Sequence, residues 1–180
     1  MNSELPAVDL ALGALRALLR DARVAFRIVG GVAVVHHGYA RTTEDLDVLV
    51  AKGAAAHIDV ALAAHGFERV GPNRLRHVAS GVRVDVLVAG EPLPRAGDGV
   101  YPSPDDLGSS ERDAEVAGLR GLIELKLRAR RHQDTADVVA LLKRLDDGRY
   151  VELEASVERS LRRALALLRV DAIEEARNER

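Results

Sequence analysis

The stretch that decides the fold runs from Arg27 to Val50 and reads RIVGGVAVVHHGYARTTEDLDVLV. Its last six residues, DLDVLV, are typical of a buried strand, although Asp45 and Asp47 lie two residues apart within it. Residues two apart in a strand point to the same face, so Asp45 and Asp47 share one face and the apolar residues form a core face. Two carboxylates about 4 Å apart repel each other by roughly 4 kcal/mol at an effective dielectric constant near 20. Such a pair requires strong solvation, protonation or a cation.

A third acid lies in the segment VRVDVLV, residues 82–88, whose alternation places Asp85 on the polar face of another strand. If the two strands are neighbours, Asp45, Asp47 and Asp85 converge. Oxygen ligands without His or Cys favour Mg²⁺ or Mn²⁺, and two such ions about 4 Å apart support phosphoryl transfer. A second interpretation stays open, in which Asp45 ends a strand and Asp47 only faces solvent.

Gly30 and Gly31 separate a strand predicted over Ala25–Val29 from a short helix predicted over residues 32–39. Glycine lets the backbone approach a phosphate closely, and a helix N-terminus favours an anion. A plain tight turn would explain the same two residues.

The spacing of these features resembles a known signature. Gly31 is followed by thirteen residues and then Asp-Leu-Asp-Val, with a further acid on a later strand. This resembles the DNA polymerase β-like nucleotidyltransferases. The segment LIELKLRARRHQDTADVVALL, residues 122–142, and the lead-in GYARTTEDLD resemble small bacterial nucleotidyltransferases of the AbiEii toxin-like and related uncharacterised groups. The resemblance covers about Arg27 to Leu142.

The resemblance implies an α+β protein with a nucleotidyltransferase head at 1–118 and a helical C-terminal region at 119–180, packed as one unit. It implies a Mg²⁺-dependent (or Mn²⁺-dependent) enzyme that transfers a nucleoside monophosphate from an NTP to an acceptor hydroxyl on a tRNA or other RNA, a protein or a small molecule. A cognate antitoxin is an implied partner. The alternative is a catalytically idle module that binds a nucleotide or a partner. The implied catalytic and metal-binding residues are Asp45, Asp47 and Asp85, and the implied nucleotide-binding residues are Gly30, Gly31, Arg41, Thr43, Lys126 and Arg131.

Several side chains near this signature have two interpretations each. Lys126 either reaches the triphosphate or belongs to a solvated basic helix end. Asp134 and Asp137 have the spacing of a helix N-cap and its N3 partner. Arg83 either orients Asp85 or contacts phosphate, or it forms an ordinary cross-strand ion pair. His36 and His37 are expected to be packing or surface residues, and the other histidines have no ligand spacing.

The remaining pattern places strands and helices first and helices alone later, which is typical of an α+β head with a helical tail. The predicted loop is 90–106. The predicted strands are 25–29, 45–51, 67–70, 74–78, 81–89 and 114–120, and the predicted helices are 5–19, 32–39, 54–66, 121–131, 134–145 and 151–175.

Composition excludes several classes of protein. The chain has 180 residues, a formal net charge of −2 and no cysteine, so no disulfide or thiolate metal site can form and no global charge bias favours nucleic acid. The first residues lack the basic and apolar regions of a signal peptide, and no apolar run has the roughly 20 residues needed to span a bilayer. We therefore expect a cytoplasmic location without a membrane partner.

Overall fold

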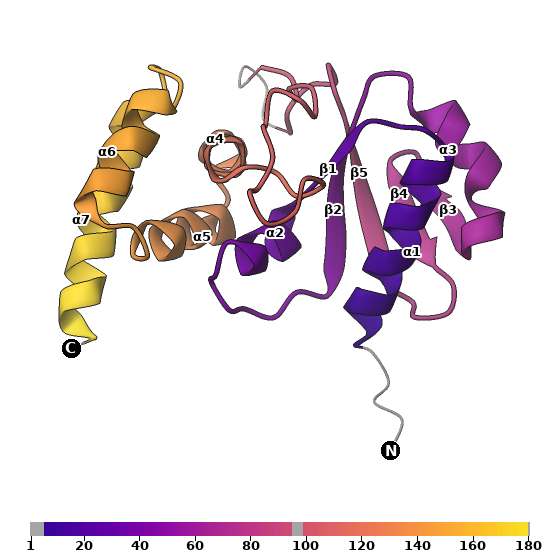
Figure 1. Ribbon diagram of the computed structural model, residues 1–180, viewed down its shortest axis with the longest axis horizontal. Coiled ribbons are helices and arrows are strands. Elements are labelled where there is room, and N and C mark those ends of the chain that lie inside the picture. The colour runs from indigo at the N-terminus through magenta and orange to yellow at the C-terminus, as the bar shows by residue number, and fades with distance from the viewer. Residues whose placement is uncertain (1–5, 95–98, 180) are drawn as a thin grey trace.

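The computed structural model describes residues 6–94 and 99–179, in which five strands form one mixed sheet (Figure 1). The strand order is β1-β2-β5-β4-β3. The central pair β2 and β5 is parallel, and the other neighbouring pairs are antiparallel. The strands are β1 (Phe26–Val29), β2 (Asp45–Val50), β3 (Phe67–Gly71), β4 (Arg74–His77) and β5 (Arg83–Val88).

Helices lie on both sides of this sheet. Figure 1 places α1 and α3 on one side, α2, α4 and α5 on the other, and α6 and α7 outermost on that second side. None of the helices in the described part of the chain has the length and apolar character needed to cross a membrane. The helices are α1 (Ala7–Asp21), α2 (Gly30–His36), α3 (Ala55–Ala61), the 3₁₀ turn η1 (Ala63–His65), α4 (Leu119–Ala129), α5 (His132–Leu142), α6 (Asp147–Ser156) and α7 (Arg162–Asn178).

The alternation in β2 and β5 is the reason that the sheet has one apolar and one polar face at its centre. Leu46, Val48 and Val84 are fully buried, whereas Asp45 and Asp47 are only partly buried. Leu15 and Leu18 of α1 are also fully buried and belong to the same core cluster. The α+β architecture expected from the sequence is confirmed.

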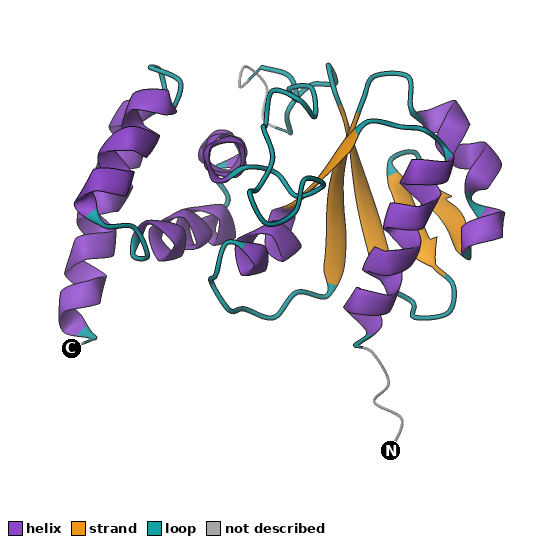
Figure 2. Cartoon of the chain, in the orientation of Figure 1, coloured by secondary structure: helices purple, strands orange, loops and turns teal. Residues whose placement is uncertain are grey.

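The predicted strand over residues 114–120 is wrong. Ile28 donates a backbone hydrogen bond to Glu115 (2.7 Å) and accepts one from Ala117 (3.0 Å), so the chain runs beside β1 only for an isolated bridge. Helix α4 then begins at Leu119. Figure 2 shows the long connection between β5 and α4 as loop, and its residues 95–98, like Leu5 of the predicted first helix, lie outside the described residues.

The single helix predicted over residues 151–175 is two helices. Asp146 caps α6 by accepting a hydrogen bond from the backbone N–H of Arg149 at 2.8 Å, which starts this helix before the expected position. The chain then leaves the helical conformation between α6 and α7, where Val157 and Leu161 are buried. Burial of these two apolar side chains holds the turn against the rest of the protein.

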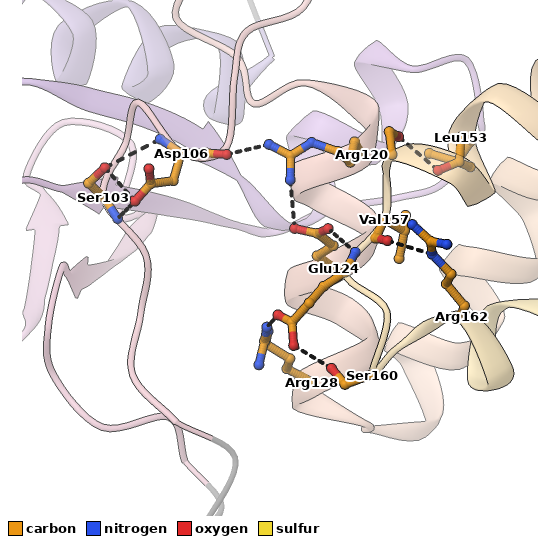
Figure 3. A network of polar contacts seen from close by, with 11 residues as sticks. Ser103, Asp106, Arg120, Glu124, Arg128, Leu153, Val157, Ser160 and Arg162 are labelled. Carbon is orange, nitrogen blue, oxygen red and sulfur yellow. Dashed lines mark hydrogen bonds and ion pairs between the residues drawn. The ribbon is translucent and has the colours of Figure 1, made fainter.

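A polar network joins the loop before α4, α4 itself and the α6–α7 turn (Figure 3). Arg120 donates to the backbone oxygen of Asp106 at 2.5 Å and to the Glu124 carboxylate at 2.9 Å. Glu124 in turn accepts the backbone N–H of Glu158 at 2.9 Å, and Glu158 pairs with Arg128. The loop before α4 and the α6–α7 turn are thereby both tied to α4.

Candidate active site

The parallel pairing of β2 and β5 brings the predicted acids together. Asp47 lies opposite Asp85, and Asp45 lies opposite Arg83. Since residues two apart share a face, the three aspartates lie on one face of the sheet. Val29, the last residue of β1, lies opposite Asp47 on the other side, so the start of α2 adjoins the acids. The strand adjacency assumed from the sequence is confirmed.

Asp47 is the most electrostatically perturbed acid of this group. Burial, followed by the charges of Asp45 and Asp85, raises the pKa of its carboxyl from 3.8 to about 6. Arg131 and Lys126 oppose this shift only in part. Among the described residues, no side chain or backbone group donates a hydrogen bond to the Asp47 carboxylate. The negative charge of Asp47 is therefore compensated only in part by Arg131 and Lys126.

The two glycines make room for side chains of this site. Gly30 has a φ of +62°, and a Cβ atom there would lie 1.8 Å from Oδ2 of Asp47. At Gly31 a Cβ atom would lie 2.5 Å from a guanidinium nitrogen of Arg41 and 2.6 Å from the hydroxyl of Thr43. Any larger residue would therefore displace the acid or the lead-in segment. The pair is more than a plain tight turn.

Arg41 and Thr43 support the site from behind and do not line the cleft. An Arg41 guanidinium nitrogen lies 3.4 Å from Oδ1 of Asp137, and its Nε is buried without a hydrogen-bond partner. Thr43 donates a hydrogen bond to the backbone oxygen of Asp45 at 3.1 Å. Their observed contacts fix the segment before β2.

Lys126 is a buried charge, so the solvated-helix-end interpretation is wrong. Its side chain is 6% exposed, and its Nζ lies 2.7 Å from Oδ2 of Asp137 and 3.3 Å from Oδ1 of Asp134. Both aspartates are themselves buried. A buried ammonium group needs such partners, because loss of hydration costs several kcal/mol. Lys126 also borders the cleft, and its ammonium group is held by these two acids.

Arg131 presents an exposed guanidinium at the cleft and is held by Asp134. The Arg131 Nε lies 2.7 Å from Oδ2 of Asp134, and a terminal nitrogen lies 3.1 Å from Oδ1. Burial would raise the pKa of Asp134, but the hydrogen bond from Arg131 and the charge of Lys126 lower it below its usual value. The prediction that Asp134 and Asp137 are the N-cap and N3 residues of a helix is wrong. Arg131 is the N-cap of α5 and Asp134 is its N3 residue. Asp137 instead accepts a hydrogen bond from Lys126.

These groups meet at a cleft of about 640 Å³ between the β3–β4 hairpin, the loop after β5 and α4. This volume falls in the range of small-molecule and nucleotide sites. Leucines of α4 and of the loop give one apolar wall. Asp45 and Gly31 are not among the lining residues, so the cleft exposes only part of the predicted set. The polar lining includes Gly30, Asp47, Arg74, Asp85, Tyr101 and Arg131.

Sequence reasoning missed Arg74 and Tyr101. The Arg74 Nε lies 2.8 Å from Oδ1 of Asp85, because β4 pairs with β5 and places Arg74 opposite Asp85. Arg83, which was expected as the partner of Asp85, is exposed and does not pair with it in the described structure. The alternation in RLRH could have placed Arg74 on one face, but only the pairing of strands identifies its partner. Burial raises the pKa of the Tyr101 hydroxyl.

The carboxylates suit a hard cation but are not arranged around a single point. Within residues 6–94 and 99–179, no three His, Cys, Asp or Glu side chains stand close enough together to hold one metal ion. Asp85 is paired with Arg74, whereas the partly compensated Asp47 carboxylate is ready to accept a cation. The donor set, oxygen only, fits Mg²⁺ or Mn²⁺ once Asp85 exchanges Arg74 for the ion.

His36 and His37 have packing roles, as expected. The Nε2 atom of His36 lies 2.8 Å from the hydroxyl of Ser110, and that of His37 lies 2.8 Å from the backbone oxygen of Ala117. Both contacts join the end of α2 to the loop before α4.

Neither a protein-family model nor a curated protein sequence matches this chain. Solved structures do. The solution structure of the antibiotic-resistance factor ANT(2'')-Ia has a TM-score of 0.55 at 12% identity, with 98% of this chain and 100% of that chain covered.

Two further structures are similar at lower scores. A protein assigned as a nucleotidyltransferase from H. pylori has a TM-score of 0.46 at 13% identity, over 96% of this chain and 95% of that one. A crystal structure of ANT(2'')-Ia in complex with adenylyl-2''-tobramycin has a TM-score of 0.45 at 12% identity, over 93% and 98%. At these identities the likeness concerns the fold alone, and the mixed five-stranded sheet with its helices is a fold that this chain shares with the solution structure of ANT(2'')-Ia.

Proposed function

We propose that this protein is a nucleotidyltransferase that transfers a nucleoside monophosphate from an NTP to an acceptor hydroxyl. The observation that carries the proposal is the Asp47 carboxylate. It is in register with Asp85, has a pKa raised to about 6 by burial and by neighbouring acids, and lines a cleft of nucleotide size. A partly compensated buried acid at a cleft is typical of a functional site, because folding alone gives no reason to place it there.

The proposed metal ligands are Asp45, Asp47 and Asp85, which would hold Mg²⁺ or Mn²⁺. When bound, such ions neutralise phosphate charge and favour ionisation of the acceptor hydroxyl. In the metal-free chain, Arg74 supplies a positive charge at Asp85. We expect Arg74 to leave Asp85 when a cation takes its place.

The proposed phosphate contacts come from Gly30 and Arg131. Gly30 lines the cleft beside Asp47, and the exposed guanidinium of Arg131 is oriented by two hydrogen bonds to Asp134. Guanidinium groups match phosphate oxygens in geometry as well as charge. Lys126 would act on the phosphates through Asp134, since its own ammonium is held by Asp134 and Asp137. In this proposal Gly31, Arg41 and Thr43 do not contact the nucleotide but hold the segment before β2 in place.

In the proposed reaction the acceptor oxygen forms a bond to the α-phosphorus of the NTP. The bond between that phosphorus and the bridging oxygen to the β-phosphate breaks, and pyrophosphate leaves with the electron pair. The hydroxyl proton passes to a nearby carboxylate or to water. An RNA such as a tRNA, a protein and a small molecule are the three acceptor classes to test, and an antitoxin partner stays a prediction.

The test is to incubate the purified protein with each α-³²P-labelled NTP, Mg²⁺ and one acceptor class at a time. Label in RNA, protein or a small-molecule fraction is the expected result, and it should vanish in Asp47→Asn. Asp171→Asn is the matched control, because Asp171 is exposed on α7, and this variant should retain full transfer. Nucleotide binding without transfer to any acceptor would favour the idle binding module instead.

A further inference from the structure

A second cleft, of about 580 Å³, is not lined by Asp45, Asp47 or Asp85. Its walls are the C-terminal end of α2, the loop at residues 109–112, the end of α5 and one side of α6. It shares no lining residue with the first cleft. Its size is again that of a small organic ligand.

Three arginines from three separate segments line this second cleft. Arg112 comes from the loop, Arg144 from the residues after α5, and Arg149 from the first turn of α6. All three are exposed, and none has a carboxylate within ion-pair distance among the described residues. By contrast Arg169, nearby on α7, pairs with Asp147 at 2.8 Å. The cleft therefore gathers guanidinium groups whose charge the protein does not neutralise.

The side chain of Arg144 packs against the backbone at Gly38. Gly38 follows α2 with a φ of +100°, and a Cβ atom there would lie 2.9 Å from the Nε of Arg144. The guanidinium therefore lies directly against the glycine backbone, where a larger residue would push it away. Packing on Gly38 limits the conformational freedom of this arginine, which lowers the entropy cost of holding it on a ligand.

The other charged groups of the second cleft reduce this positive charge without cancelling it. Glu111 and Glu152 are its two acids. His36 is hydrogen-bonded to Ser110. Burial lowers the pKa of His37, and the charges of His36 and Arg112 lower it further, so His37 adds no positive charge at neutral pH. Three arginines against two glutamates leave the cleft with a net positive charge.

We propose that this second cleft binds a phosphate ester of nucleotide chemistry, held between Arg112, Arg144 and Arg149. Guanidinium groups approaching from three segments match the tetrahedral oxygens of a phosphate better than the two coplanar oxygens of a carboxylate. The hydroxyl groups of Ser109 and Ser110 line the same cleft and can add hydrogen bonds. A free mononucleotide and a phosphate of an RNA chain share this chemistry.

Fluorescence anisotropy with a fluorescein-labelled ten-nucleotide RNA tests the proposal and distinguishes the two sources. The full chain is used in EDTA, so that metal-dependent binding at the first cleft is suppressed, and unlabelled AMP is the competitor. The variants are Arg144→Ala/Arg149→Ala and, from the opposite wall, Arg112→Glu. The matched control is Arg159→Ala/Arg163→Ala, which removes two exposed arginines outside the cleft and without a carboxylate partner in the described structure.

Both cleft variants should bind the probe at least about tenfold more weakly than wild type, because removing one charge-assisted hydrogen bond typically weakens binding by about that factor or more. The control should stay within about twofold of wild type. Displacement of the RNA by AMP identifies a mononucleotide site, and resistance to AMP identifies a site for the RNA chain. An equally weakened control, or no binding of the labelled RNA to wild type, overturns the proposal. Binding is measured in EDTA and without NTP, so the result is independent of transfer at the first cleft.

Discussion

Asp47 holds a proton more tightly in the folded chain than in the unfolded chain, because burial and the neighbouring Asp45 and Asp85 raise its pKa from 3.8 to about 6. Below about pH 3.8 the carboxyl is protonated in both the folded and the unfolded chain, so it does not lower the free energy of unfolding. Between that pH and about 6 the unfolded chain loses its proton first, so the free energy of unfolding falls as the pH rises. Above about pH 6 the full cost remains, about 3 kcal/mol for a shift of this size.

We therefore predict that Asp47→Asn stabilises the protein in metal-free buffer. Its melting temperature should exceed that of wild type by several degrees at pH 7.5, and the difference should shrink toward pH 4.5. Thermal melts followed by circular dichroism at both pH values measure this, with Asp171→Asn as the exposed control. A lower melting temperature for Asp47→Asn would show that Asp47 is a structural group held by hydrogen bonds.

The Lys126 ammonium, unlike the Asp47 carboxylate, is a buried charge with partners of opposite charge, Asp134 and Asp137. Removing one member of a buried ion pair typically costs 3–5 kcal/mol, whereas an exposed pair is worth less than about 1 kcal/mol. We predict that Lys126→Met lowers the free energy of unfolding by about 3–5 kcal/mol. Arg128→Met on the same helix should lower it by less than about 1 kcal/mol, because Arg128 pairs with Glu158 in a more exposed position.

Urea denaturation of the two variants measures this difference. Adding Asp137→Asn to Lys126→Met should restore part of the missing stability, because it removes the charge of a buried acid that has lost Lys126 and keeps only Arg41, at 3.4 Å, as an ion-pair partner. Equal small decreases in both single variants would mean that the Lys126 cluster is not a structural unit.

At the scale of elements, the pairing of β4 with β5 controls whether Asp85 is available. Arg74 is opposite Asp85 in this pairing, and its side chain is 54% exposed in the ion pair. An exposed pair contributes about 0.2–1 kcal/mol. We predict that Arg74→Ala tightens Mn²⁺ binding by up to about fivefold, because the cation no longer displaces Arg74. Isothermal titration calorimetry of the nucleotide-free protein measures the affinity.

Arg76→Ala is the matched control for Arg74→Ala. Arg76 lies two residues further along β4, is 52% exposed and pairs with Glu68 instead of an acid of the site. Its removal should leave the Mn²⁺ affinity unchanged. The double variant Asp45→Asn/Asp47→Asn should abolish the binding. Mn²⁺ affinity equal in Arg74→Ala and wild type would count against competition between Arg74 and the cation.

Elements with strong local patterns could be predicted from the sequence. The acidic and apolar alternation of β2 and β5 identified both strands and the shared face of the acids. Residues 114–120 have an apolar pattern too, but their strand-like contacts are two isolated bridges, from Val116 to Ile28 and from Ala117 to Ser109, which local sequence does not encode. The break between α6 and α7 depends on burial of Val157 and Leu161 against the rest of the protein, so an amphipathic period alone missed it.

The candidate site, like the fold, could be predicted from the sequence only in part. The three acids and Gly30 follow from spacing and resemblance, and the structure brings Asp47, Asp85 and Gly30 to one cleft. The partners of Lys126 and Asp85 did not follow, because each depends on how two elements pack. Basic residues near a helix end are usually solvated, and only the packing of α4 on α5 shows that Lys126 is not.

At the scale of the whole molecule, α6 and α7 complete the core that α5 begins. Leu153, Leu165 and Ala172 are buried and belong to the same cluster as Leu141 and Leu142 of α5. Burial of each leucine contributes roughly 1.5–3 kcal/mol. Several such side chains together rival the roughly 5–15 kcal/mol by which a domain is usually stable. The two helices therefore stabilise the α4–α5 pair that borders the first cleft.

We predict that a chain ending at residue 145 loses cooperative unfolding, because it exposes the apolar face of α5 and removes the hydrogen bond and ion pair that Glu158 makes to α4 (Figure 3). A chain ending at residue 175 is the control, since it keeps the buried Ala172 and removes mainly the ion pair between Lys143 and Glu179. Urea denaturation followed by far-ultraviolet circular dichroism should give a steep transition for the control and a broad or absent one for the shorter chain. The same midpoint and slope in both chains would mean that the sheet with α1 to α5 is stable without α6 and α7, and that these helices serve another purpose such as forming the second cleft.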